Sequence, residues 1–486
     1  MKNRKALFLQ IFLLVVVSTI NLYINSSKYL NYSFDLDEIF AINYANNIDE
    51  FRYWNYFNSD LGNPPFFFFL LRVWMQISTS DIWLRILPLI FYYLSIFISM
   101  KILKTLKLNK KLQLLAIVSL LGIGFYFYLG FYVRAYSLLL LLSLMTIYYT
   151  FNIDLQKSKF DLIKLTLTIF IGLHTHYIYW IFLLFWTLAY IGSLLGNQKQ
   201  SSKIWQFLLA ISLGTLLSLP LINNLISREL FNHGEKYHWW QLSSSKMNPF
   251  DIWSMTLKVN KNKMPMNLSA LGWILWVIFF LLTLLNFQNN ECNKQKLILL
   301  FNLLFWATYL VTPLGKFINV IKYIALFVFL LFFSIILIIE NFLNKVSFSN
   351  HQKKIIYPFF IIFIVIWSLL PMPNTYQVQG GDDWKSVVAL VENEYEDYGI
   401  ILDCLNTPAF DYYGKSNTAI YGTTMLDSGN NCQLPLINNY YKTLNKILLI
   451  DTKEIMSGIG IENSYSLVEI KYDYQPIILM TYEKTY

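Results

Sequence analysis

The chain has 486 residues, of which 56% are apolar, 18% are aromatic and only 14% are charged, and its mean hydropathy is +0.44. Soluble enzymes carry about 25% charged residues, so this composition excludes an ordinary soluble enzyme and indicates a polytopic membrane protein. The low counts of Gly (19), Pro (13) and Cys (3) also exclude collagenous, disordered and disulfide-scaffold classes.

Apolar runs recur along the first part of the chain at lengths that suit membrane helices, which need about 20 residues. Eleven spans are predicted, near residues 6–24, 82–104, 112–131, 134–152, 161–175, 177–196, 203–222, 268–287, 297–313, 319–340 and 355–371. The first begins with basic residues but is followed by no small-residue cleavage site, so we expect an uncleaved anchor.

Residues 64–79 form a shorter apolar run that opens with Pro64 and Pro65. At about 1.5 Å per residue this run does not cross a bilayer core of roughly 30 Å, and Arg72 lies in its middle. Proline suits the first turn of a helix, where N–H groups have no partner in the helix. We therefore expect an interfacial helix here; if the run did span, every later loop would change sides.

The lysines between the predicted spans indicate the orientation, because cytoplasmic loops are enriched in Lys and Arg. Lysine-rich loops near residues 101–111, 157–159, 199–203, 294–296 and 345–354 alternate with loops poorer in lysine. This alternation predicts a multi-pass protein of the inner (plasma) membrane, with a cytoplasmic N-terminus and outer loops at about 25–80 and 223–267. The second outer loop is an exception, since it holds one Arg and five Lys.

The composition changes near Pro371, which predicts a boundary between a membrane domain, residues 1–371, and a soluble extracytoplasmic domain, residues 372–486. The second part holds 15 Asp and Glu, 7 Lys and no Arg. Its patterns predict a helix at 384–395 and strands at 399–403, 446–451 and 465–472, which favours an α/β fold with a docking or covering role. Cys404 and Cys432 lie in this part, and their spacing leaves open whether they pair.

Acidic residues are scarce before residue 372, and six of the fourteen lie in the first outer loop. Within it, Asp37 and Glu38 directly precede an amphipathic stretch. Carboxylates are favoured at a helix N-terminus, so this pair is either a simple helix cap or a pair of chemical groups placed where water meets membrane.

Five motifs in order resemble the membrane glycosyltransferases of the protein O-mannosyltransferase and lipid A aminoarabinose transferase superfamily. They are Asp37-Glu38, Asn63-Pro64-Pro65-Phe66, residues 84–88, residues 133–137 and His176-Tyr177, with residues 383–388 and Tyr412-Tyr413 similar in the C-terminal part. The resemblance covers nearly the whole chain. It implies a GT-C fold: an α-helical polytopic membrane protein of about 11 transmembrane helices and interfacial helices, with a C-terminal extracytoplasmic α/β domain.

The resemblance also implies a function, the transfer of a sugar from a polyprenyl-phosphate carrier to an acceptor hydroxyl or amine on a glycan, lipid or protein. Displacement at the anomeric carbon needs a base and a positive group for the departing phosphate. The resemblance makes Asp37 the base, and Glu38 the neighbour that orients the acceptor or tunes Asp37.

Candidates to bind the lipid phosphate or the sugar lie at the outer ends of the predicted spans: Arg85, Arg134, Tyr136, His176, Lys316, Lys322 and Tyr323. For Arg85, Arg134 and Lys322 the alternative is snorkelling to the membrane interface. The family often has Lys or His where this chain has Asn63, which removes one expected phosphate contact.

His174 and His176 are close in sequence, but His-x-His alone is a weak metal signal, because no further ligand is near in sequence. We expect His176 to hydrogen-bond phosphate or sugar, or to form a polar interface turn. No metal ligand is assigned, and a divalent cation is an alternative source of positive charge.

The rival function is a transporter or flippase of a lipid-linked sugar. Transporters place ionisable groups at the bilayer midplane and often contain repeats with broken helices, and the sequence shows neither pattern visibly. A nucleic-acid partner is not implied.

Overall fold

The computed structural model describes residues 33–34, 36–46, 64–122, 124–153, 159–194, 201–221, 268–289, 292–311, 321–345, 384–395, 398–403, 412–414, 420–423, 446–451, 465–474 and 477–484. The chain divides into two compact units. Unit 1 contains Met1–Tyr29, Ile48–Phe231 and Trp239–Tyr376; unit 2 contains Leu30–Asn47, Asn232–His238 and Gln377–Tyr486. Residues 30–47, which the sequence places with the membrane domain, thus group with the C-terminal residues.

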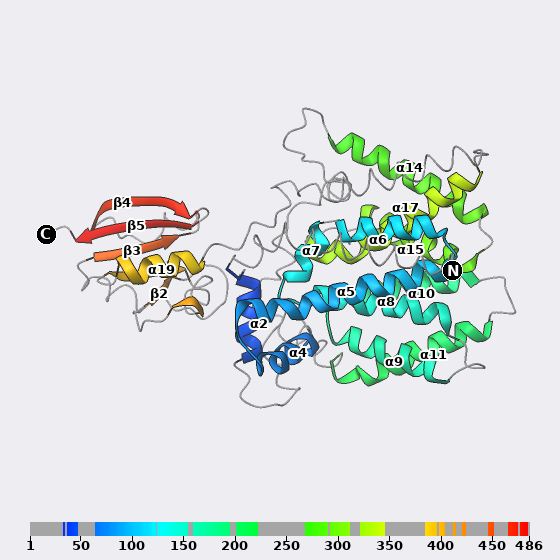
Figure 1. The fold of residues 1–486 in the computed structure, drawn as a ribbon, viewed down its shortest axis with the longest axis horizontal. Coiled ribbons are helices and arrows are strands. Elements are labelled where there is room, and N and C mark those ends of the chain that lie inside the picture. Colours follow the sequence, from blue (N-terminus) through cyan, green and yellow to red (C-terminus); the bar gives the residue numbers. More distant parts are fainter. Residues whose placement is uncertain are drawn as a thin grey trace, which may run out of the picture. The chain divides into compact units, whose positions relative to one another are not determined.

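Unit 1 is helical throughout its described residues, and its long helices lie along one another (Figure 1). The helices are α4 (Phe66–Met75), α5 (Asp81–Thr105), α6 (Lys110–Gly122), α7 (Gly124–Phe131), α8 (Tyr136–Asn152), α9 (Lys159–Leu173), α10 (Ile178–Leu194), α11 (Ser201–Leu217), α14 (Leu268–Asn289), α15 (Asn293–Val311) and α17 (Ile321–Lys345). Apart from α4, they occupy the apolar runs from which nine of the spans were predicted. The predicted spans 6–24 and 355–371 lie outside the described residues.

The expected set of full-length spans is reproduced only in part. Two described segments, Asp81–Thr105 and Tyr323–Leu343, are long and apolar enough to cross a membrane. Others are shorter than the predicted spans. The predicted span 112–131 contains α6 and α7, between which residue 123 lies outside the described residues, and α9 ends at Leu173, two residues before the predicted span ends.

α4 has the form expected for the 64–79 run. Pro65 directly precedes the helix, and the ten residues Phe66–Met75 end before the chain enters α5. Two tryptophans join the helices: the rings of Trp74 and Trp83 stack with centroids 4.4 Å apart. Each indole Nε1–H donates to the other residue's carbonyl, at 2.8 Å from Trp74 and 3.1 Å from Trp83. α4 is therefore tied to the first turn of α5.

Polar side chains connect the apolar helices at a few points. On α15, Asn302 Nδ2 donates to the Leu330 carbonyl at 3.0 Å and to Ser334 Oγ at 2.9 Å, both on α17. Its Oδ1 accepts from Trp306 Nε1 at 3.2 Å. Phe305 and Phe327 stack between the same helices with centroids 3.6 Å apart. Because Asn302 is fully buried, these bonds are what make its amide compatible with the core.

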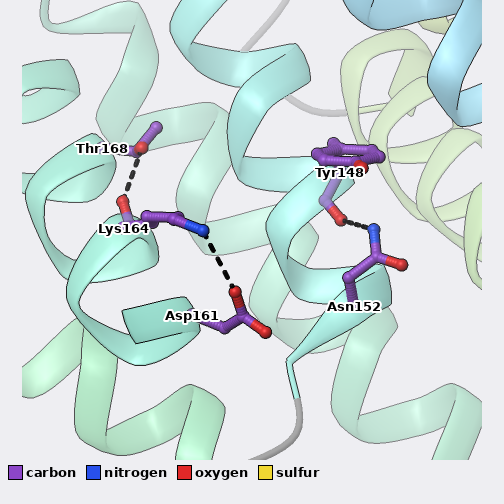
Figure 2. Close-up of polar contacts among 5 residues, drawn as sticks. All are labelled: Tyr148, Asn152, Asp161, Lys164 and Thr168. Atoms are coloured by element: carbon purple, nitrogen blue, oxygen red, sulfur yellow. Dashed lines mark hydrogen bonds and ion pairs between the residues drawn. The ribbon is translucent and has the colours of Figure 1, made fainter. Parts of the chain in front are cut away.

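The charged pair in α9 lies near the start of that helix. Figure 2 shows Lys164 Nζ 3.4 Å from Asp161 Oδ1, and the lysine side chain is 53% exposed. The Thr168 hydroxyl donates to the carbonyl of Lys164 at 2.7 Å. On α8, the side-chain amide of Asn152 likewise donates to the carbonyl of Tyr148. Lys164 is thus an exposed, ion-paired residue in the second turn of α9.

In its described residues, unit 2 contains the helices α2 (Leu36–Asn46) and α19 (Trp384–Glu394) and a five-stranded sheet of order β2-β1-β3-β5-β4. β1 (Gly399–Asp403) pairs in parallel with β2 (Ile420–Thr423) and β3 (Lys446–Asp451). β5 (Ile477–Lys484) pairs antiparallel with β3 and with β4 (Tyr465–Tyr474). The predicted helix and three predicted strands are confirmed, and β2 and β5 are additional. Cys404 and Cys432 lie outside the described residues.

Candidate functional site

The turn between α7 and α8 holds Arg134. In this turn the backbone N–H of Arg134 donates to the Tyr132 carbonyl at 2.7 Å. Ser137, one residue into α8, donates its hydroxyl to the Leu129 carbonyl at 2.6 Å. These bonds tie the end of α7 to the start of α8 and hold Arg134, which is half-buried, at the turn itself.

Arg85 reaches the same turn from α5. Its side chain is only 5% exposed, and Nη1 donates to the carbonyl of Phe131 at 3.3 Å. A buried guanidinium that bonds to backbone lies inside unit 1, which disfavours the snorkelling alternative for Arg85. The two predicted arginines are therefore brought to one turn from different helices.

The turn between α9 and α10 holds His176. Thr175 donates its hydroxyl to the Ile171 carbonyl at 2.7 Å, and the backbone N–H of Tyr179 donates to the His176 carbonyl at 2.9 Å. A Cβ on Gly172 would overlap the ring of Tyr179, whose hydroxyl lies 2.6 Å from Thr146 Oγ1 of α8. The absence of a side chain at Gly172 thus lets Tyr179 pack where it fixes this turn.

α4 is attached to the same turn. The backbone N–H of Phe66, the first residue of α4, donates to the carbonyl of His174 at 2.9 Å. This is one of the four N–H groups that a helix leaves without an internal partner. The bond places the Pro-Pro motif and the His-x-His motif side by side, although more than 100 residues separate them in the sequence.

Three predicted residues form an aromatic cluster that joins these turns to α17. Ring centroids lie 5.4 Å apart for Tyr136 and His176, 5.4 Å for His176 and Tyr323, and 6.0 Å for Tyr136 and Tyr323. Tyr132 extends the cluster, stacking on Tyr136 at 6.0 Å. We name Tyr132, Tyr136, His176 and Tyr323 the ring cluster. Three of its members were predicted from the sequence, and Tyr132 was not.

His176 is neutral in this environment. Burial, and secondly the positive charge of Arg134, lower its pKa from 6.5 to about 3. Its Nδ1 accepts the backbone N–H of Ile178 at 3.1 Å, so in the neutral ring the proton is on Nε2. The turns thus combine a permanent cation, Arg134, with a neutral histidine that can donate from Nε2, an arrangement suited to binding an anion.

The remaining predicted binding residues are placed less fully. Lys322 lies in the first turn of α17, directly before Tyr323, and only its backbone is described. Lys316 lies outside the described residues. Among the described residues, no three His, Cys, Asp or Glu side chains are grouped so that they could hold a metal ion.

Asp37 and Glu38 belong to unit 2, in the first turn of α2. This is the helix N-terminus that the sequence predicts. Asp37 is half-buried, whereas Glu38 is 2% exposed. The two neighbouring carboxyl groups therefore have different environments, and Asp37 is the more accessible to solvent.

Solved structures with the same architecture are known. ArnT from Cupriavidus metallidurans in the apo state is 8% identical, with a TM-score of 0.54 over 99% of this chain and 98% of that chain. ArnT bound to undecaprenyl phosphate is 9% identical, with a TM-score of 0.51 over 98% and 97%. The oligosaccharyltransferase of Archaeoglobus fulgidus in the apo form is 10% identical, with a TM-score of 0.52 over 85% and 64%.

No family model matches the sequence, and no curated protein matches it either. The similarity to the solved structures is one of fold, and it extends over almost the full length of both this chain and ArnT. The chain therefore has the fold of ArnT and of the archaeal oligosaccharyltransferase.

Proposed function

We propose that the chain is a polyprenyl-phosphate-sugar-dependent glycosyltransferase that acts at the outer face of the membrane, within EC class 2.4. The observation that carries the proposal is that neutral His176 lies in the ring cluster, packed against Tyr136 and within electrostatic reach of Arg134, in a fold shared with ArnT bound to undecaprenyl phosphate. The archaeal oligosaccharyltransferase of the same fold has been solved with an inhibitory peptide and a dolichol-phosphate. Each of these two proteins has thus been solved with a lipid phosphate.

In the proposed reaction, an acceptor hydroxyl or amine attacks the anomeric carbon of the donor sugar. The new bond to the acceptor forms as the bond to the phosphate oxygen breaks, and the acceptor proton passes to Asp37. The departing lipid phosphate takes the bonding electron pair and develops negative charge. Groups that are already oriented toward that charge lower the barrier most.

Arg134 and His176 supply such groups. Arg134 is a fixed cation, and Nε2–H of neutral His176 is a hydrogen-bond donor that does not have to lose a proton of its own. Arg85 adds a second positive charge at the α7–α8 turn. In the proposal Tyr136 and Tyr323 line the donor, while Lys322 and Lys316 contribute further positive charge.

Asp37 is preferred over Glu38 as the base because of its exposure. A base must reach the acceptor, and Asp37 is half-buried whereas Glu38 is 2% exposed. Glu38 then orients Asp37 or the acceptor. A divalent cation is retained only as an additional source of charge; the archaeal oligosaccharyltransferase has also been solved with Zn and sulfate.

The test is transfer by the full chain in lipid nanodiscs, measured as release of undecaprenyl phosphate from undecaprenyl-phosphate-linked hexose, hexosamine and aminopentose donors. Asp37→Asn should lower kcat by about 100- to 10,000-fold, the usual contribution of a general base. Asp60→Asn, a change of the same kind in the same predicted loop, is the matched control. Wild-type turnover by Asp37→Asn would refute the assignment of the base.

A further inference from the structure

Ser33 and Phe34, which lie three and two residues before the start of α2, are bonded to the C-terminal part of unit 2. The backbone N–H of Phe34 donates to Tyr413 Oη at 2.6 Å, across 379 residues of sequence. The backbone N–H of Lys385 donates to Ser33 Oγ at 2.9 Å, across 352 residues. In the first bond the segment is the donor, through the Phe34 N–H, and in the second it is the acceptor, through the Ser33 hydroxyl. Ser33 and Phe34 therefore attach the segment to two different C-terminal elements.

Each bond satisfies a backbone group that local structure leaves without a partner. Lys385 is the second residue of α19, and the first N–H groups of a helix have no internal acceptor. Ser33 supplies that acceptor as an N-cap residue does, but from a distant part of the chain. Phe34 is fully buried, so its N–H would be costly without the Tyr413 hydroxyl.

Ring packing strengthens the attachment. Phe34 contacts Tyr412 edge to face, with centroids 5.8 Å apart and planes at 74°. Tyr412 in turn packs against Tyr413 at 5.0 Å and 88°. The two tyrosines therefore hold both the side chain and the backbone of Phe34.

These anchors lie close to the proposed base. Asp37 follows Phe34 by three residues, and an extended chain covers at most about 3.6 Å per residue, so its Cα is within about 11 Å of the anchored Phe34 Cα. α2 has 11 residues. Isolated helices shorter than about 12–15 residues are marginally stable in water, so α2 depends on tertiary anchors for its position.

We propose that Ser33 and Tyr413 are positioning residues, through which the C-terminal part of unit 2 holds the Asp37 carboxylate in its reactive position. The C-terminal part then takes part in the reaction through α2 instead of only covering or docking. This inference rests on the proposed role of Asp37 as the base.

The first test measures amide exchange in the full chain in nanodiscs and requires no activity. Tyr413→Phe keeps the ring and removes the acceptor, so exchange at Phe34 and through α2 should become about tenfold faster. Exchange in β3 and β5 should not change, whereas a general loss of stability would accelerate it there too. Tyr398→Phe is the control, because Tyr398 is a half-buried tyrosine of the same unit that packs on Tyr395 at 5.2 Å.

The second test measures turnover of undecaprenyl-phosphate-linked sugar. Tyr413→Phe and Ser33→Ala should lower kcat by about 10- to 100-fold and leave the KM of the donor unchanged, since a displacement near 1 Å of a reacting group costs up to about 100-fold. Ser33→Thr keeps a hydroxyl that can accept from Lys385, and it should restore most of the rate.

The outcomes separate this inference from the proposed function. If Asp37→Asn turns over like wild type, the base assignment fails, and this inference fails with it. If Asp37→Asn is inactive while Tyr413→Phe and Ser33→Ala match wild type in kcat, the positioning role is wrong and the base assignment stands. Unchanged exchange at Phe34 in Tyr413→Phe would also overturn the positioning role.

Discussion

The backbone N–H of Ile178 donates a hydrogen bond to Nδ1 of His176 at 3.1 Å. The acceptor nitrogen carries no proton, so the ring is neutral and its proton is on Nε2. This bond fixes the orientation of the ring and leaves Nε2–H as a hydrogen-bond donor. In this state His176 acts as a donor and not as a general base.

Acid should destabilise the folded chain through His176. Its pKa is about 3 in the folded protein against 6.5 ordinarily, because of burial and the nearby Arg134 charge. Between these values the unfolded chain binds a proton that the folded chain does not. The free energy of unfolding therefore falls as the pH drops below about 6.5, by at most about 1.4 kcal/mol per pH unit from this residue. Unfolding of His176→Asn, followed over the same pH range, should lack this component; an identical slope would contradict the neutral assignment.

The two amide substitutions of His176 should have different effects. Asn keeps an acceptor near the Nδ1 position and removes the Nε2 donor, whereas Gln keeps a donor near Nε2 and removes the acceptor for Ile178. We expect His176→Asn to lower kcat/KM for the lipid-linked donor by about 10- to 100-fold, the value of a hydrogen bond to a charged group. His176→Gln should retain more activity but unfold more easily. Equal activity in both variants would show that Nε2 does not contact the donor.

Gly172→Ala should disturb the α9–α10 turn, because the added Cβ overlaps the Tyr179 ring. Overpacking of this kind costs about 1–3 kcal/mol. A double variant with Tyr179→Leu has room for the methyl group, so its destabilisation should be smaller than the sum of the two single effects. Thermal unfolding of the four proteins in the cycle measures the coupling, and additive effects would rule out the predicted overlap.

Asn302→Leu should destabilise unit 1 by about 1–3 kcal/mol, because Trp306 Nε1 and the Ser334 hydroxyl lose a buried partner. Asn286→Leu is the matched control. That residue is half-buried on α14, and its Nδ2 donates to the Leu282 carbonyl of its own helix, at 2.7 Å. We expect the control to stay within about 0.5 kcal/mol of wild type.

The orientation predicted from the lysine pattern can be tested with reporters. A reporter fused after Tyr486 should be active outside the cytoplasm, and one placed within residues 195–200 should be active inside. Cytoplasmic activity after Tyr486 would mean that the span count is wrong by one, and residues 64–79 would be the first segment to re-examine.

Local patterns in the sequence were sufficient to predict most elements. The apolar runs predict α5 and α14 to within two residues at each end, and the patterns that predict β1 and β3 give their bounds. These elements depend on side chains close together in sequence, where periodicity and burial agree. Helix ends set by turns are predicted less well: Gly172 and Tyr179 fix the end of α9 through packing that hydropathy does not record.

The candidate site divides in the same way. Residue type and family resemblance were sufficient to select Tyr136, His176 and Tyr323, which the fold does bring together. The attachment of Phe34 to Tyr413 was missed, because a bond between residues 379 apart leaves no local pattern. Ser33 lies three residues before α2, yet its hydroxyl accepts the N–H of Lys385 in the first turn of α19, as a cap residue does.

The crossed bonds between Trp74 and Trp83 make these two residues interdependent in evolution as well as in structure. Replacing either indole removes one donor to the opposite carbonyl and one ring of the stack, so a homologue that has lost one tryptophan should have lost the other as well. Their parallel rings, with planes 5° apart, should also give an excitonic signal in circular dichroism. The signal would report, without any label, whether α4 stays packed on α5 during purification or when a lipid ligand is added.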